Sequence, residues 1–224
     1  MNKLEQLEGL RKELETADLP LKNFANLVFG EGDINCAVMF IGEAPGFNED
    51  AQKRPFVGRA GKLLDECITD IGWKRADVYI TNIVKRRPPD NRDPLPEEIE
   101  AYKPYLARQI EIINPKIIAT LGRFSMNYFL PFAKISRDHG KVFEAENPSS
   151  SATADFGEAR RIIFPLYHPA AALRATTVLD ELKNDFKKLP DVVAGKSPTP
   201  PPAAGGGSTT LVKKSEKPAQ AKLF

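Results

Sequence analysis

Three polar side chains in this sequence could do chemistry together, because each stands at or near the end of a short apolar run. They are Glu43, Asn82 and His168. A carboxylate can accept a proton, an amide offers one donor end and one acceptor end, and an imidazole can donate a hydrogen bond. The plainer alternatives are a solvated glutamate beyond a turn and a histidine that is satisfied in the core. The choice depends on whether the elements that carry these side chains bring them together.

The surrounding elements are expected to alternate between strands and helices. Buried strands are predicted at 38–41, 78–84, 116–121 and 161–166. Helices are predicted at 2–16, from Gly61 to about Gly72, at 96–113, at 123–130, and from Pro169 to about Leu189. This alternation predicts an α/β fold of three layers, α/β/α, with a central, mainly parallel sheet of four strands. Parallel strands end at one edge of a sheet, so the three side chains can converge there.

Two glycine-containing turns allow a ligand to approach the backbone. Residues 42–46 form a tight turn after the first predicted strand. Gly61 stands near the start of a predicted helix, where it could admit a phosphate to backbone amides or simply allow close packing. For residues 134–160 we expect a hairpin around His139 and Gly140 and a flexible excursion at 147–153.

A rigid basic loop follows the second predicted strand. The segment 85–94 contains three prolines, which exclude regular structure, and it carries Lys85, Arg86, Arg87 and Arg92. Such a loop at a strand end can contact phosphates, and the alternative is a solvated run of charges.

Composition restricts the class of protein but does not name a partner. The chain has 224 residues, 42% of them hydrophobic, and a net charge of only +2. Cys36 and Cys67 stand in apolar surroundings without metal-ligand spacing, so reduced, buried thiols are expected. The charged, amphipathic start is neither a signal peptide nor a membrane span, and we expect a monomer in the bacterial cytosol or nucleoid.

The expected organisation has three parts. Residues 1–18 form an N-terminal helix, 19–192 form the main domain, and 193–224 form a tail that is rich in proline, glycine and serine and is expected to be disordered.

Four motifs stand out along the chain: GEAPG at 42–46, PFVGRAG at 55–61, NIVKRRPPDNRDP at 82–94 and HPAAALR at 168–174. Together they resemble the uracil-DNA glycosylases of the iron–sulfur, thermostable type, often called family four. The resemblance runs from about Val28 to Leu189. It implies an enzyme that flips uracil out of DNA and hydrolyses its N-glycosidic bond, which leaves an abasic site for base excision repair. The alternative is a non-catalytic member of the fold that binds DNA or uracil.

The resemblance also implies a uracil pocket. Phe56 would stack on the pyrimidine, and the amide of Asn82 would pair with N3–H and O4, a pattern that cytosine does not match. Glu49 is similar to the side chain that crowds C5 and excludes thymine, and a surface carboxylate is the equal alternative. Gly42 and Ala44 would complete the pocket.

For catalysis, the resemblance implies that His168 donates a hydrogen bond to uracil O2 as negative charge develops there. Glu43 would stabilise the cationic sugar or place the attacking water, and Asn91 would hold the water or the loop. Ala44 stands where another branch of the superfamily has an aspartate, so the identity of the general base is open.

For DNA binding, the resemblance implies that Lys85, Arg87 and Arg92 contact phosphates. Leu173 and Arg174 would enter the minor groove and fill the gap left by the flipped base. The alternative for Leu173 is packing of the last helix.

The chain departs from the family pattern at the iron–sulfur cluster. Relatives of this type use four cysteines, but here the loop position is Arg86 and the helix position is Tyr102. The segment 19–24 has no cysteine, and Cys36 and Cys67 fall at neither place. We therefore expect no cluster and no metal, with packing of Tyr102 against residues 19–24 in its place.

The tail carries a separate hypothesis. Gln220, Leu223 and Phe224 resemble the short peptide by which bacterial repair proteins bind the replication sliding clamp. The preceding linker would supply reach.

Overall fold

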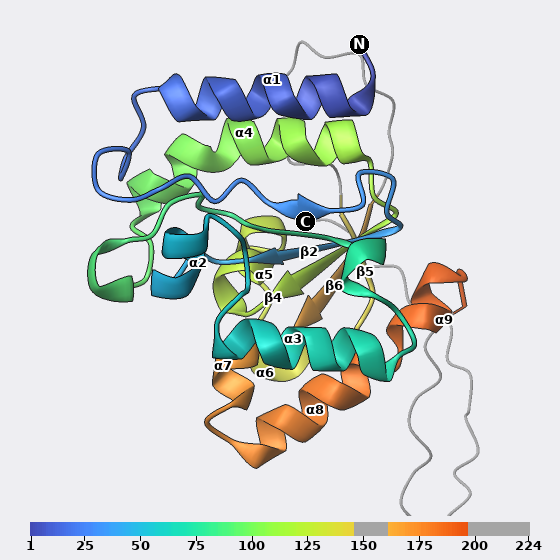
Figure 1. The fold of residues 1–224 in the computed structure, drawn as a ribbon. Coiled ribbons are helices and arrows are strands. Elements are labelled where there is room, and N and C mark those ends of the chain that lie inside the picture. Colours follow the sequence, from blue (N-terminus) through green and yellow to red (C-terminus); the bar gives the residue numbers. More distant parts are fainter. Residues whose placement is uncertain (146–160, 197–224) are drawn as a thin grey trace, which may run out of the picture.

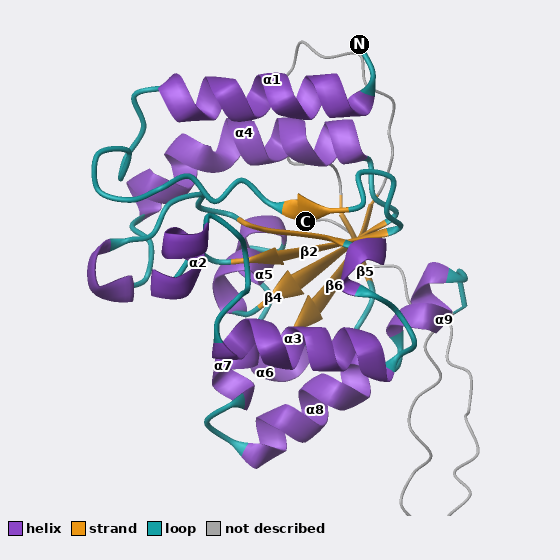
Figure 2. Ribbon diagram, viewed as in Figure 1, coloured by secondary structure: helices purple, strands orange, loops and turns teal. Residues whose placement is uncertain are grey.

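A six-stranded sheet lies between two layers of helices in the computed structural model, which describes residues 1–145 and 161–196 (Figures 1 and 2). The strands are β1 (Glu31–Gly32), β2 (Val38–Gly42), β3 (Tyr79–Asn82), β4 (Ile117–Leu121), β5 (Phe143–Ala145) and β6 (Arg161–Leu166). The helices are α1 (Lys3–Thr16), α2 (Phe47–Gln52), α3 (Arg59–Asp70), α4 (Pro96–Ile113), α5 (Arg123–Phe129), α6 (Ile135–Asp138), α7 (Pro169–Ala172), α8 (Thr176–Phe186) and α9 (Leu189–Val193). Short 3-10 turns span Arg75–Asp77 and Pro89–Asn91.

The sheet confirms the predicted fold class but has more strands than predicted. Its order is β1-β3-β2-β4-β6-β5, and the four inner strands are parallel. The edge strands β1 and β5 run antiparallel to their neighbours. The prediction of four strands was wrong because β1 and β5 are only two and three residues long and carry no apolar run.

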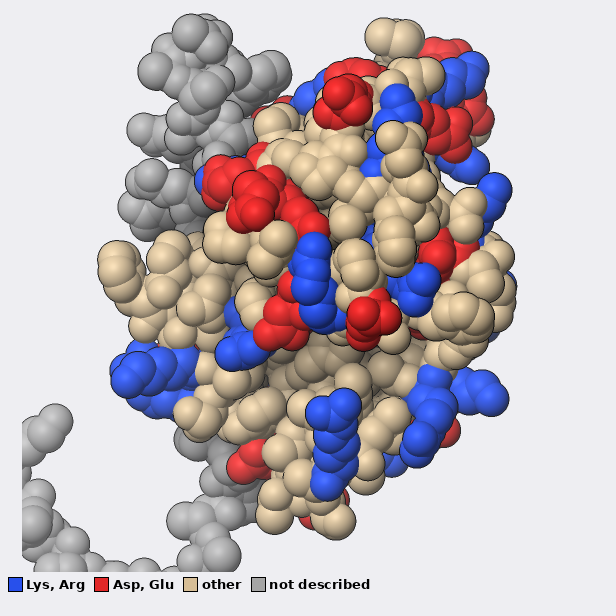
Figure 3. Space-filling model, turned by 90° about the vertical axis from the view of Figure 1, so that its left-hand side faces the viewer, with Lys and Arg blue, Asp and Glu red and all other residues tan. Residues whose placement is uncertain are grey.

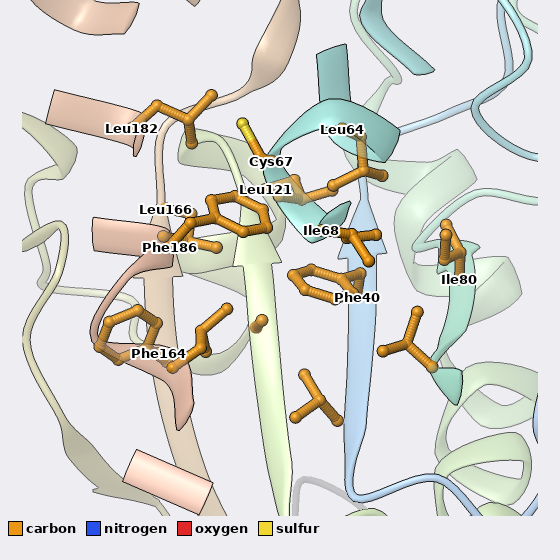
Figure 4. Packing of buried hydrophobic residues seen from close by; sticks show 14 of the residues in the cluster. Phe40, Leu64, Cys67, Ile68, Ile80, Leu121, Phe164, Leu166, Leu182 and Phe186 are labelled. Carbon is orange, nitrogen blue, oxygen red and sulfur yellow. The ribbon is translucent and has the colours of Figure 1, made fainter. Parts of the chain in front are cut away.

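Successive residues of β2 point into two different cores. Phe40 joins the core under α3, α7, α8 and α9, where its ring stacks on Phe186 of α8 with centroids 5.5 Å apart (Figure 4). Met39 and Ile41 join the core under α1, α4 and α5 on the opposite face. Every residue of β2 is buried, as expected for a central strand covered on both faces.

The N-terminal helix is part of this packing. Its start is fixed by a capping box between Asn2 and Glu5. Leu7, Leu10 and Leu14 are buried against α4, so α1 lies along α4 in one helical layer (Figure 1).

Two predicted elements differ from the structure. The single helix expected from Pro169 to about Leu189 is divided into α7 and α8, because residues 173–175 leave the helix and Ala175 is extended. A further short helix, α9, begins at Leu189. The hairpin expected around His139 and Gly140 is instead helix α6 followed by β5. The predicted excursion at 147–153 and most of the predicted tail lie outside the described residues.

Within 1–145 and 161–196, no helix combines the length and apolar character needed to span a membrane.

Candidate active site

A cavity of about 660 Å³ opens at the carboxyl ends of the parallel strands. This is the place where open α/β sheets bind ligands, since the loops beyond the strand ends meet there. The predicted residues in its lining are Glu43, Ala44, Glu49, Phe56, Asn82, Asn91, Arg92, His168 and Arg174. Figure 3 faces this side of the molecule, where basic and acidic side chains are interspersed around a hollow. The sequence-based expectation that Glu43, Asn82 and His168 converge is therefore met by the structure.

Asn82, the last residue of β3, contributes a buried amide to the wall. Its side chain is only 1% exposed, and its Oδ1 finds no hydrogen-bond partner among the described residues. A buried acceptor without a partner is costly, so a ligand that brings a donor would be stabilised there.

Phe56 and Gly42 lie beside this amide. A β-carbon on Gly42 would overlap Asn82 Oδ1 and come within 2.5 Å of the Phe56 ring, so only glycine leaves room for both. Gly42 itself is behind the lining rather than in it. Phe56 has a left-handed backbone, φ +50°, which is unusual for a bulky residue and is typical of functional sites.

The backbone of Phe56 is held by the start of α3. A β-carbon on Gly61 would overlap the Phe56 carbonyl, so Gly61 serves close packing at this point. Of the two alternatives for Gly61, the structure supports packing.

His168 follows β6 and caps the N-terminus of α7. Its Nδ1 accepts a hydrogen bond from the backbone amide of Ala170 at 3.1 Å. Burial lowers the pKa of His168 from 6.5 to about 4, against the opposing influence of Glu49. The imidazole is therefore neutral at pH 7, and since Nδ1 is an acceptor, Nε2 carries the proton. Its ring lies 5.7 Å from that of Phe56, centroid to centroid.

Glu43 follows β2 and is half-buried in the cavity wall. Burial raises its pKa from 4.5 to about 7, and the negative charge of Asp93 adds to the rise, while Arg123 opposes it. A carboxylate with a pKa near neutrality can exchange a proton at physiological pH.

Glu49 also belongs to the cavity. Its Oε1 accepts hydrogen bonds from the backbone amides of Val57 and Gly58, at 2.9 and 2.8 Å, at the start of α3. Of the two alternatives for Glu49, the structure thus supports a fixed wall residue over a free surface carboxylate.

The basic loop is only partly available to DNA. Lys85 is fully buried, and its Nζ donates to Thr81 Oγ1 and Gln109 Oε1, both at 2.6 Å. The prediction that Lys85 contacts a phosphate was therefore wrong, because its side chain points into the core under α4. Burial also lowers the pKa of this amine well below its ordinary value.

The two arginines that were expected to contact phosphates, Arg87 and Arg92, already have partners within the protein. Arg92 forms a two-pronged ion pair with Glu98, at 2.9 and 2.6 Å. Arg87 lies 3.4 Å from Asp50, and its guanidinium is about 5.5 Å from the ring centres of both Phe24 and Phe47. These contacts hold the loop on α4 and α2.

Beyond His168, Leu173 and Arg174 are both exposed, and Arg174 lines the cavity. Leu173 is 42% exposed, which does not fit the alternative that it packs the last helix. Asn91, also exposed, lines the cavity in a left-handed turn with φ +53°.

The cavity lining also contains residues that the sequence analysis did not single out, among them Gly122, Arg123 and Tyr167. Gly122 and Arg123 directly follow β4, so the strand-end reasoning that found the others would have found them too. Gly122 has φ +90°, and a β-carbon there would lie 2.9 Å from His168 Cβ.

At the positions where the resemblance implies cluster cysteines, the structure has a polar contact network. Tyr102 donates its hydroxyl to the Pro20 carbonyl at 2.6 Å, and Arg86 donates to the Ala25 carbonyl at 2.7 Å. Cys36 and Cys67 are buried on opposite faces of the sheet, and burial raises the pKa of each thiol to about 11. These side chains do not fit an iron–sulfur cluster, which needs thiolates gathered at one place.

Comparisons with known proteins agree with this geometry. The family model of the uracil DNA glycosylase superfamily matches residues 29–189. A type-4 uracil-DNA glycosylase of Archaeoglobus fulgidus is 43% identical over 88% of this chain and 98% of its own length. Those of Sulfurisphaera tokodaii and Saccharolobus solfataricus are each 46% identical, over 83% and 76% of this chain and 84% and 78% of their own lengths. The chain belongs to the uracil DNA glycosylase superfamily.

Proposed function

We propose that the cavity receives a uracil flipped out of DNA and that the protein is a uracil-DNA glycosylase, a hydrolase of N-glycosyl bonds in DNA repair. The activity is that of the type-4 relatives, which match along most of the chain. The assignment to this cavity rests on the buried, unpaired Oδ1 of Asn82. Asn82 lines the same cavity as Phe56 and His168. Uracil N3–H supplies the missing donor, whereas N3 of cytosine has no hydrogen to give.

In this proposal His168 stabilises the leaving group. The bond between the sugar C1′ and uracil N1 breaks, and its electron pair passes to the uracil ring and O2. Nε2–H of the neutral imidazole donates to O2, and this hydrogen bond strengthens as negative charge develops. The Ala170 amide fixes the tautomer that makes the donation possible.

Glu43 serves the other half of the reaction. A water adds its oxygen to C1′, and one of its protons passes to the Glu43 carboxylate, while the released uracil anion later takes up a proton from solvent. The pKa of Glu43, raised to about 7, matches this role better than an ordinary carboxyl would. Asn91, on the rim, is suited to hold this water or the loop.

The test is a cleavage assay on oligonucleotides with one uracil, opposite guanine or in a single strand, followed by strand scission at abasic sites. We expect the wild type to form abasic product and Asn82→Asp to lose about a hundredfold or more in rate, because a carboxylate has no donor for O4. Asn82→Asp should also favour cytosine relative to uracil, since the cytosine amino group donates to it. Tight binding of uracil-containing DNA without product from the wild type would favour the non-catalytic alternative.

We also propose that this member of the family works without an iron–sulfur cluster. Arg86 is a cation and Tyr102 is a hydrogen-bonded phenol, and neither is a ligand of such clusters. Iron and sulfide analysis of protein purified without oxygen tests this proposal, and a stoichiometric cluster would refute it.

A last proposal concerns the sequence at Gln220, Leu223 and Phe224, which lies outside the described residues. We propose that it binds the replication sliding clamp, on the resemblance of the peptide alone. Deletion of residues 219–224 should abolish clamp binding and leave uracil release from short DNA unchanged, and equal clamp binding by the truncated chain would refute it.

A further inference from the structure

A second cavity, of about 350 Å³, lies between the end of α1, the segment 17–30 and the end of α2. Its lining is strongly cationic, with Arg11, Lys22, Lys53 and Arg86 against the single carboxylate of Glu15. Such a lining attracts an anion, since the local charge is far more positive than the chain as a whole.

The charge of this cavity is poorly compensated within the protein. Glu15 lies 3.4 Å from Arg11, its neighbour one helical turn away. Lys22 donates to the Thr16 carbonyl at 2.5 Å, which orients its ammonium group without neutralising it. Lys53 is exposed and makes no ion pair among the described residues. An incoming anion would therefore meet at least two cations that lack a carboxylate partner.

Arg86 supplies the second observation that points to a ligand. Its side chain is in the wall of the cavity and only 5% exposed, yet no carboxylate of the described residues forms an ion pair with it. One nitrogen donates to the Ala25 carbonyl at 2.7 Å, and the guanidinium also interacts with the Tyr102 hydroxyl, while Nε is buried without a partner. A buried guanidinium whose charge no carboxylate neutralises is unfavourable, and a bound anion would offset that cost.

The two cavities lie at the two ends of helix α2. Gly46 and Glu49, at its start, line the first cavity, and Lys53, just beyond its end, lines the second. The six residues of α2 span about 9 Å, which corresponds to the rise of roughly three nucleotides along the axis of a DNA duplex. The end of α1, the segment 17–30 and α2 all reach the left-hand side of Figure 1, toward which the parallel strands point. The residues that line the first cavity follow the ends of these strands.

We propose that the second cavity is a phosphate-binding site, which in the DNA complex takes a backbone phosphate a few nucleotides from the flipped uracil. The position of Arg86, where the resemblance places a cluster cysteine, thus becomes part of a DNA contact. The proposal rests on the proposed function only for the source of the phosphate; a free phosphate has the same chemistry, and the test separates the two.

The experiment compares Lys22→Gln/Lys53→Gln with Lys12→Gln/Lys187→Gln, in which the same charge is removed from exposed lysines that line neither cavity. Binding is measured against salt concentration on a long duplex with a central U·G pair, on the same duplex without uracil, and on a trinucleotide with a central uracil. Amide chemical shifts of residues 53 and 86 are followed by NMR during titration with inorganic phosphate.

For a DNA phosphate, we expect the slope of log K against log salt on both duplexes to fall by about one or two in the Lys22/Lys53 variant and to stay near that of the wild type in the control. Binding of the trinucleotide should be equal in all proteins. The duplex without uracil keeps this outcome readable even if no uracil is ever released, so failure of the proposed function is recognised separately.

For a free phosphate, the duplex slopes should be unchanged and the phosphate-induced shifts at 53 and 86 should disappear in the Lys22/Lys53 variant alone. Unchanged slopes together with no phosphate-induced shifts in the wild type would overturn the proposal. Equal losses on the trinucleotide and the duplexes would do so as well, because the effect would then come from the uracil cavity.

Discussion

The backbone amide of Ala170 donates a hydrogen bond to Nδ1 of His168, and this contact decides which nitrogen of the imidazole faces a ligand as a donor. A neutral imidazole with Nδ1 as acceptor must carry its hydrogen on Nε2. Sequence and structure meet here, because Pro169 at the first position of α7 starts the helix whose free amide is capped by the histidine.

His168→Ala should lower the rate constant of uracil release by about a hundredfold to a thousandfold, since one hydrogen bond to the developing charge is lost. Single-turnover cleavage measures the chemical step. The affinity for uracil-containing DNA should change much less than the rate. A variant that cleaves as fast as the wild type would remove His168 from the mechanism.

His168 should also affect stability in acid. Its pKa lies near 4 in the folded protein and near 6.5 when exposed, so the unfolded chain binds the extra proton more readily. The stability of the wild type should therefore fall as the pH drops from about 6.5 towards 4, and His168→Ala should show less of this fall. Urea unfolding at several pH values measures the difference.

Glu43 should set the acidic limb of the activity profile. Because the pKa of Glu43 is raised to about 7, kcat/KM should rise with pH through about 7 as the carboxylate forms. In Glu43→Gln, kcat/KM should be about a hundredfold lower and should no longer show this rise. In the folded protein the charged form is disfavoured, so stability declines as pH rises from 4.5 to about 7. Glu43→Gln should accordingly be more stable than the wild type at pH 8, and a destabilised variant would contradict this account.

Substitutions of Arg174 and Lys85 should affect the salt dependence of DNA binding differently, because Arg174 is exposed at the cavity and Lys85 is buried. Arg174→Ala should reduce the salt slope of DNA binding by about one, because an exposed guanidinium at the cavity is lost. Lys85→Met should leave that slope unchanged, since the amine of Lys85 is buried and donates to Thr81 and Gln109 in the core. A reduced slope for a folded Lys85→Met protein would restore the original expectation.

Gly61→Ala should distort the cavity through Phe56, a lining residue whose backbone contacts Gly61. The added methyl group would overlap the Phe56 carbonyl, so the ring of Phe56 must shift, and KM should rise while the fold is retained. Gly9→Ala on α1 is the matched control, because nothing lies within 4 Å of that position and an alanine should add about 0.5–1 kcal/mol of stability. Thermal unfolding and steady-state kinetics on both variants make the comparison.

Tyr102→Phe should cost about 0.5–1.5 kcal/mol of unfolding free energy, because the partly buried Pro20 carbonyl loses its donor. Tyr105→Phe, on the same helix, is the control, since the Tyr105 hydroxyl forms no hydrogen bond among the described residues. Equal stability of the two variants would show that the contact contributes nothing at this position.

Much of the fold could be predicted because its signals are local. The four inner strands are short runs in which apolar residues predominate. Pro96 with Glu97 and Glu98 fixed the start of α4 at the predicted residue. The missed elements β1, β5, α2 and α6 are too short to show a period. The strands β1 and β5 form because their neighbours β3 and β6 give them hydrogen-bond partners.

By itself, the sequence determined the family resemblance, the layered α/β fold and the convergence of Glu43, Asn82 and His168. The convergence could be predicted because parallel strands end at one edge of the sheet, so the residues that follow them lie close together. Only the tertiary structure decided that Lys85 points into the core and Arg86 into the wall of a second cavity, while Glu49 faces the first. In the sequence, Lys85 and Arg86 are simply two adjacent positive charges in a loop. The direction of each side chain is set by a partner far away in the chain, which is Gln109 for Lys85 and the Ala25 carbonyl for Arg86.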